Sequence, residues 1–172
     1  MYYYYFYFGG DIFENPQNYD IDYFFYDDEK LIHIASGGVY PFGIFKQIIP
    51  ENYIALKKII LLRRRFTIEE NENIQRDNLN TMEDYRSFFN LMASRGFYSY
   101  DKVNIDNPGC YKFQLIANPI YNTNIKIQNN EIYNLENSNK ENKTWNYDFD
   151  LQKINRKFPI DNIIFDIREY LE

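Results

Sequence analysis

The sequence is poor in the residues that build disulfide frameworks and metal sites. It has one cysteine, Cys110, and one histidine, His33, among 172 residues. A single cysteine cannot form an internal disulfide, and zinc sites need several cysteine or histidine ligands. The composition therefore excludes a disulfide-stapled fold, favours a reducing compartment, and predicts neither a metal centre nor a cofactor.

Long apolar runs are also missing. No stretch approaches the roughly 18 consecutive apolar residues that a membrane-spanning helix needs. The N-terminal "MYYYYFYFGGDIF" lacks the positive region and small-residue cleavage site of a signal peptide. We therefore expect a soluble, cytoplasmic protein without a membrane partner.

Basic residues are fewer than acidic residues. The chain has 19 Lys and Arg against 25 Asp and Glu, and its net charge is −6. Its one basic run, at residues 63–65, is short, whereas binding to a phosphate backbone needs clustered cations. We expect no nucleic-acid partner. An acidic surface suits a basic protein partner, or serves solubility alone.

Aromatic residues are abundant, with 18 Tyr and 15 Phe. They can supply the core of a single domain over residues 1–172, since a chain of this length buries roughly 70% of its unfolded surface. The tyrosines exceed what such a core easily hides, because each buried hydroxyl needs a partner. Tyrosine is enriched at protein–protein interfaces.

Alternating apolar residues predict strands that come in hairpins. A first strand is expected at residues 2–8. A hairpin follows at 22–36, with Tyr26 opposite Leu31 and Phe24 opposite His33. A second hairpin, over 97–117, turns at "NIDNPG", and a weaker strand pair is expected within 123–135.

Three segments show helical patterns. Residues 50–66 favour a helix, with a buried strand as the alternative. A helix from Thr81 should end at Gly96. Residues 159–172 place six apolar side chains at helical spacing, which predicts an amphipathic helix docked on the sheet: Ile160, Ile163, Ile164, Ile167, Tyr170 and Leu171. The polar stretches 67–80 and 136–146 are expected to be loops.

Because the strands come in hairpins and do not alternate singly with helices, the predicted fold class is α+β. We expect a mostly antiparallel sheet of roughly four to six strands, with two or three helices packed on one face.

Candidate chemistry is sparse. Acid–base catalysis needs a histidine beside a carboxylate or a nucleophile. The hairpin register instead surrounds His33 with Leu31, Phe24 and Tyr26, which favours a structural role. The following "ASGG" matches no phosphate-binding loop and predicts a bend, although an anion-binding backbone nest is an alternative. Cys110 is interpreted as a small packed residue.

Carboxylates come in closely spaced pairs, Asp20 with Asp22 and Asp148 with Asp150. Such pairs can ligate Mg²⁺ or act as acid and base, but a solvated surface is the favoured interpretation.

The segment "NYDIDYFFYDDE", residues 18–29, interleaves aromatic and acidic side chains. Charge raises the rate of association with a basic protein, and aromatic anchors set affinity. The predicted partner-binding residues are Asp20, Asp22, Tyr23, Tyr26, Asp27, Asp28 and Glu29.

Two short motifs, "HIASGGVYP" at 33–41 and "ASRGFYSYD" at 93–101, resemble small bacterial immunity proteins of polymorphic or contact-dependent toxin systems. The resemblance implies a cytoplasmic, non-enzymatic protein that binds and neutralises a cognate toxin domain, often a basic nuclease. The resemblance does not identify binding residues in this sequence. The alternatives are a structural or assembly protein of a mobile element, or an enzyme of unrecognised type that uses His33.

Overall fold

The computed structural model describes residues 22–27, 29–35, 65–75, 82–104, 106–107, 109–121, 125–128, 131–134, 143–146, 152–161 and 163–171. The strand predicted at 2–8, residues 36–38 of the "ASGG" bend and residues 50–64 of the helix predicted at 50–66 lie outside these residues. The extent of the domain also stays a prediction.

Strands dominate the described part of the chain. The elements, in chain order, are β1 (Asp22–Tyr26), β2 (Leu31–Ala35), β3 (Thr67–Glu70), α3 (Met82–Ser94), β4 (Phe97–Lys102), β5 (Lys112–Ile120), β6 (Ile125–Gln128), β7 (Glu131–Asn134), β8 (Lys143–Asn146), β9 (Gln152–Lys153), β10 (Phe165–Asp166) and α4 (Arg168–Leu171).

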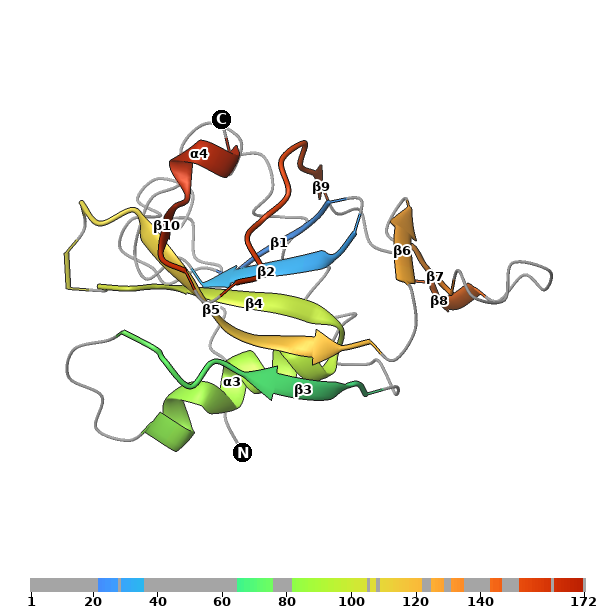
Figure 1. Ribbon diagram of the computed structural model, residues 1–172, viewed down its shortest axis with the longest axis horizontal. Helices are drawn as coiled ribbons and strands as arrows, with labels where there is room; N and C mark the ends of the chain where they lie inside the picture. Colours follow the sequence, from blue (N-terminus) through green and yellow to red (C-terminus); the bar gives the residue numbers. More distant parts are fainter. Residues whose placement is uncertain are drawn as a thin grey trace, which may run out of the picture.

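Seven strands form the main sheet, in the order β10-β5-β4-β2-β1-β9, with β3 also paired to β5 (Figure 1). Both predicted hairpins are confirmed. Strands β1 and β2 pair antiparallel with Phe24 opposite His33 and Tyr26 opposite Leu31. Strands β4 and β5 also pair antiparallel. The predicted pair β6 and β7 forms a separate three-stranded sheet with β8.

The sheet is mixed, so the expectation of a mostly antiparallel sheet built from hairpins holds only in part. Strand β2 runs parallel to β4, and β1 runs parallel to β9. Parallel neighbours need a long crossover, which the chain between β2 and β4 provides. The α+β class itself is confirmed, with two helices among the described residues.

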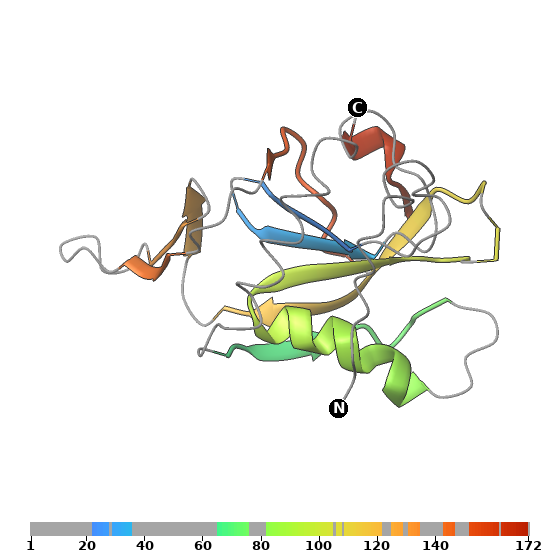
Figure 2. The ribbon, with the colours of Figure 1, turned by 180° about the vertical axis from the view of Figure 1, so that it is seen from behind.

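The two helices lie on opposite faces of the sheet, so the prediction that they share one face is wrong (Figures 1 and 2). On one face, Phe89 of α3 packs with Ala35 and Ile116. On the other, Tyr170 of α4 packs against the larger core cluster, which includes Tyr100 and Phe158. The sheet is therefore the central layer.

The C-terminal helix predicted over 159–172 is wrong as well. Only α4 is helical, and β10 precedes it. Ile160 and Ile163 are 58% and 48% exposed, whereas Ile167 is buried. Packing explains the difference: Phe158 and Phe165 contact the Tyr100 ring, with centroids 5.4 and 5.7 Å away. These aromatic contacts override the helical spacing of the isoleucines.

Two segments predicted as loops contain strands, β3 within 67–80 and β8 within 136–146. The helix predicted between Thr81 and Gly96 is confirmed as α3, and Gly96 follows it with a positive φ of 96°. Across the residues described, no helix has the length and apolar character to cross a membrane.

Candidate functional site

The turn between β1 and β2 is organised by Asp27. Its Oδ1 accepts hydrogen bonds from the backbone amides of Glu29 and Lys30, both at 2.8 Å. Its Oδ2 lies 2.9 Å from Lys30 Nζ, and both side chains are buried. A buried ion pair holds together only with such additional hydrogen bonds. Asp27 is thus a structural residue of the turn.

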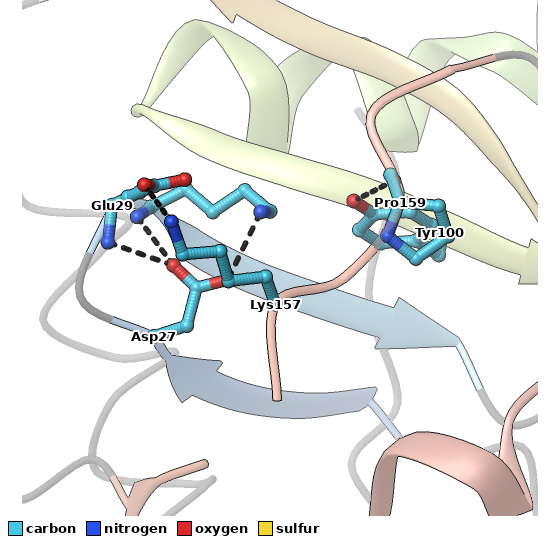
Figure 3. A network of polar contacts seen from close by, with 6 residues as sticks. Asp27, Glu29, Tyr100, Lys157 and Pro159 are labelled. Atoms are coloured by element: carbon cyan, nitrogen blue, oxygen red, sulfur yellow. Dashed lines mark hydrogen bonds and ion pairs between the residues drawn. The ribbon is translucent and has the colours of Figure 1, made fainter. Parts of the chain in front are cut away.

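The side chains predicted to bind a partner lie mostly in the interior. Tyr23 and Tyr26 are 1% and 8% exposed, and Asp27 is 2% exposed. Of the predicted residues that are described, only Glu29 is well exposed, at 56%, and it contacts Lys157 (Figure 3). Asp20 and Asp28 lie outside the described residues. The role of this segment in binding stays a prediction, but its tyrosines are core residues here.

His33 joins two polar side chains. Its Nε2 lies 2.9 Å from Asp22 Oδ1, and its Nδ1 lies 2.6 Å from Ser99 Oγ. The expectation of a purely aromatic environment is therefore wrong. The parallel pairing of β2 and β4 places Ser99 beside His33, and this pairing could not be inferred from the hairpin pattern.

The Asp22–His33–Ser99 chain has the order of groups used in nucleophilic catalysis. With Nε2–H donating to the carboxylate, Nδ1 can accept the hydroxyl proton of Ser99. However, His33 and Ser99 are both 0% exposed. The ring of Phe88, from α3, lies edge-on to His33 at 5.3 Å. Helix α3 thus packs directly over His33, and the arrangement observed is a buried hydrogen-bond network.

A different surface brings acidic and aromatic groups together around Tyr98 of β4. Tyr121 lies 6.3 Å from the Tyr98 ring, and Phe66 packs edge-on to Tyr121 at 5.0 Å. Burial raises the pKa of Tyr98, and the nearby carboxylates of Asp27, Glu69 and Glu29 raise this pKa further. We call Tyr98, Tyr121, Phe66, Glu29 and Glu69 the Tyr98 surface.

Strands β3 and β4, the β1–β2 turn, and the residues just before β3 and just after β5 build the Tyr98 surface. Glu29 belongs to the β1–β2 turn and Glu69 to β3, and both are exposed. Tyr98 is partly buried, and Lys30 Nζ lies 5.8 Å from the centre of its ring. The Tyr121 hydroxyl donates to the carbonyl oxygen of Gly96 at 2.7 Å, which fixes its ring. Burial raises the pKa of Tyr121 well above its usual value.

Sequence reasoning missed this surface because it placed Glu69 in a loop and confined the acidic groups to residues 18–29. A short strand with two glutamates has little of the alternating apolar pattern that marks a strand. The "FYSYD" motif does contain Tyr98, the partly buried aromatic residue at the centre of this surface.

Within the described ranges, no group of three or more His, Cys, Asp or Glu side chains is placed to hold a metal ion. Asp148 and Asp150 fall outside those ranges. Comparisons with protein-family models, curated proteins and solved structures found no match.

Proposed function

We propose that this protein is a non-enzymatic, cytoplasmic binding protein that recognises a basic protein partner. The observation that carries the proposal is the Tyr98 surface, where the exposed carboxylates of Glu29 and Glu69 act electrostatically on a partly buried tyrosine. A partly buried aromatic ring can anchor a partner without ordering a flexible side chain. The surrounding carboxylates, and a net charge of −6, favour a cationic partner.

The most specific form of the proposal is an immunity protein that binds and neutralises a basic toxin domain, such as a nuclease. The resemblance of "HIASGGVYP" and "ASRGFYSYD" to immunity proteins supports this form. Strand β4 begins within the second motif, and Tyr98 belongs to it.

The experiment starts from the neighbouring genes. A gene for a large secreted protein with a toxic C-terminal domain should lie beside this one. We expect the purified toxin domain to bind this protein and to lose its toxicity. The Tyr98→Ala variant should bind more weakly, whereas Asp106→Asn, an exposed carboxylate in the β4–β5 turn, should bind normally. Equal binding by both variants would refute a role for the Tyr98 surface.

The Asp22–His33–Ser99 network favours a second candidate, an enzyme in which Ser99 is the nucleophile and His33 the base. Its burial is the argument against this candidate. If the enzyme hypothesis is right, Ser99→Ala and His33→Gln should each abolish activity while binding stays intact. If both variants keep full biological activity, the binding function stands alone.

A further inference from the structure

Strand β3 is an edge of the main sheet. It pairs antiparallel with β5 along one side, and none of the strands that the structure describes pairs with its other side. In Figure 1 it lies at the margin of the sheet, beside α3. An open edge presents backbone N–H and C=O groups that can pair with another chain. The edge is therefore a surface on which an extended segment can be added.

The register identifies the groups that point outward. The Asn71 amide donates to the carbonyl oxygen of Ile116 at 2.9 Å, so the pair Asn71–Ile116 is hydrogen-bonded. Such pairs alternate along an antiparallel ladder. Ile68 and Glu70 therefore direct their N–H and C=O groups away from β5. Pro119, opposite Ile68, agrees with this assignment because it has no N–H to donate.

The edge is held rigidly at both ends, which lowers the entropy lost on binding. The Phe66 amide donates to the carbonyl oxygen of Ser94 at 2.8 Å. Arg86 Nη1 donates to Glu70 Oε2 at 3.0 Å, and Arg86 Nη2 donates to the carbonyl oxygen of Asn71 at 2.8 Å. These contacts to α3 keep the strand extended. A preorganised edge needs little reorganisation to accept a partner strand.

The charge of β3 distinguishes between two partners for its open edge, a second copy of this chain and a basic segment of another protein. Glu69, Glu70 and Glu72 are all exposed on β3 or directly after it, and Glu70 is already paired with Arg86. A second copy of the chain would bring two such rows of glutamates together, and like charges opposite each other destabilise a strand pair. A basic segment would instead gain favourable contacts, because its side chains on the same face as Glu69 would lie next to that carboxylate.

We propose that β3 binds an extended basic segment of the partner protein by strand addition. This contact includes Glu69, which β3 shares with the Tyr98 surface. This inference rests on the proposed function and specifies how the partner is engaged. Backbone hydrogen bonds from Ile68 and Glu70 provide the pairing, and Glu69 selects for cationic side chains.

The test uses the full chain and a short blocked peptide of alternating lysine and valine as the probe. Amide hydrogen exchange is followed by NMR. In the free protein, the Ile68 and Glu70 amides should exchange fast and the Glu69 amide slowly. Adding the peptide should slow exchange at Ile68 and Glu70 by about tenfold. The same peptide N-methylated on alternate amides, and its glutamate–valine counterpart, should give no protection.

A matched pair of variants separates pairing from folding. Ile68→Pro removes an outward N–H and leaves the β5 ladder its donors, as proline on an edge strand does. Ile68→Val keeps the N–H. Peptide protection should vanish in the first variant and persist in the second, while the amides of β4 and β5 stay protected in both, which shows that the sheet has folded.

Three results would overturn strand addition. The first is a lack of protection of the β3 amides by the lysine–valine peptide. The second is equal protection by the N-methylated peptide and its parent, which would mean side-chain binding alone. The third is protection that rises with protein concentration without peptide, which would assign the edge to self-association. In the second case the Tyr98 surface would still bind cations, and the proposed function would survive.

Discussion

His33 illustrates how one residue can resemble a catalyst and serve as a structural element. Its two ring nitrogens contact Asp22 and Ser99 inside the protein. Replacing it with glutamine leaves at least one of these buried polar groups without its partner, which costs about 1–3 kcal/mol. We expect His33→Gln to lower the free energy of unfolding by that amount in a urea titration.

Partner binding by the folded His33→Gln protein should stay within a few-fold of the parent. A loss of activity of 100-fold or more with folding intact would instead indicate acid–base catalysis, whose typical contribution is about 10²–10⁴-fold.

Asp27 provides a second test, because it serves both the turn and a buried ion pair. Asp27→Ala would leave the buried Lys30 ammonium unpaired, and removal of one partner of a buried pair costs about 3–5 kcal/mol. Asp27→Asn keeps an oxygen for the amides of Glu29 and Lys30 and should cost less. Denaturation of both variants measures the difference. Equal, small losses would show that the pair does not stabilise the fold.

Buried tyrosines make the stability sensitive to alkaline pH. Burial raises the pKa of Tyr100 and of Tyr121 well above the usual value. In the unfolded chain both phenols ionise near pH 10. The unfolded state therefore binds fewer protons above that pH, so stability is complete below pH 10 and falls as the pH rises beyond it.

We expect denaturation midpoints to fall steeply between about pH 10 and pH 12, together with the rise in phenolate absorbance. Tyr100→Phe, which also loses the hydrogen bond to the Pro159 carbonyl, should flatten that dependence. An equally steep fall in this variant would exclude Tyr100 as a cause.

At the level of elements, the C-terminal segment offers a matched comparison of two isoleucines. Ile167 is buried at 5% exposure, whereas Ile163 is 48% exposed. Ile167→Ala should cost roughly 2–5 kcal/mol of unfolding free energy. Ile163→Ala should change it by less than about 0.5 kcal/mol, as surface substitutions do. If the two losses were equal, the segment would dock as the helix that the sequence predicts.

The sequence predicts the elements whose partners are neighbours in the chain. The β1–β2 hairpin, the β4–β5 hairpin and α3 are confirmed because turn chemistry, alternation and Gly96 act within a few residues. The parallel pairing of β2 with β4 is different, since it joins residues far apart. No local pattern encodes that register.

The same distinction explains the candidate site. The sequence predicts the hairpin register but not the contact of His33 with Asp22, and the contact with Ser99 depends on the parallel pairing of β2 with β4. The Tyr98 surface depends on the order β3, β5, β4, in which β3 is a short strand of polar residues. The isoleucines at 160 and 163 have helical spacing, yet the aromatic packing of Phe158 against Phe165 determines the conformation of their segment.

At the scale of the whole molecule, net negative charge should govern the kinetics of association. The double variant Glu29→Gln, Glu69→Gln removes two exposed charges from the Tyr98 surface and little packing. We expect a slower association rate with a basic partner, and a weaker dependence of that rate on salt, since less attraction remains to be screened.

Tyr98→Ala should act mainly on dissociation, with an off-rate raised more than tenfold if the residue contributes about 1.4 kcal/mol or more. Surface plasmon resonance at two salt concentrations measures both rates, with Asp106→Asn as the control. Unchanged kinetics in the double variant would place the contact on another face. The remaining candidate is then the acidic segment at residues 18–29, tested by Asp20→Asn with Asp28→Asn.

The parallel pairing of β1 with β9 has a consequence for how the protein is made. Glu29, at the tip of the first hairpin, contacts Lys157, 128 residues later in the chain. A ribosome adds about 5–20 residues per second, so roughly 6–26 s separate their synthesis. During that interval the aromatic side chains of β1 lack the C-terminal layer that covers them. We therefore expect the nascent chain to expose apolar surface, and to be prone to aggregation, until its last strands are made.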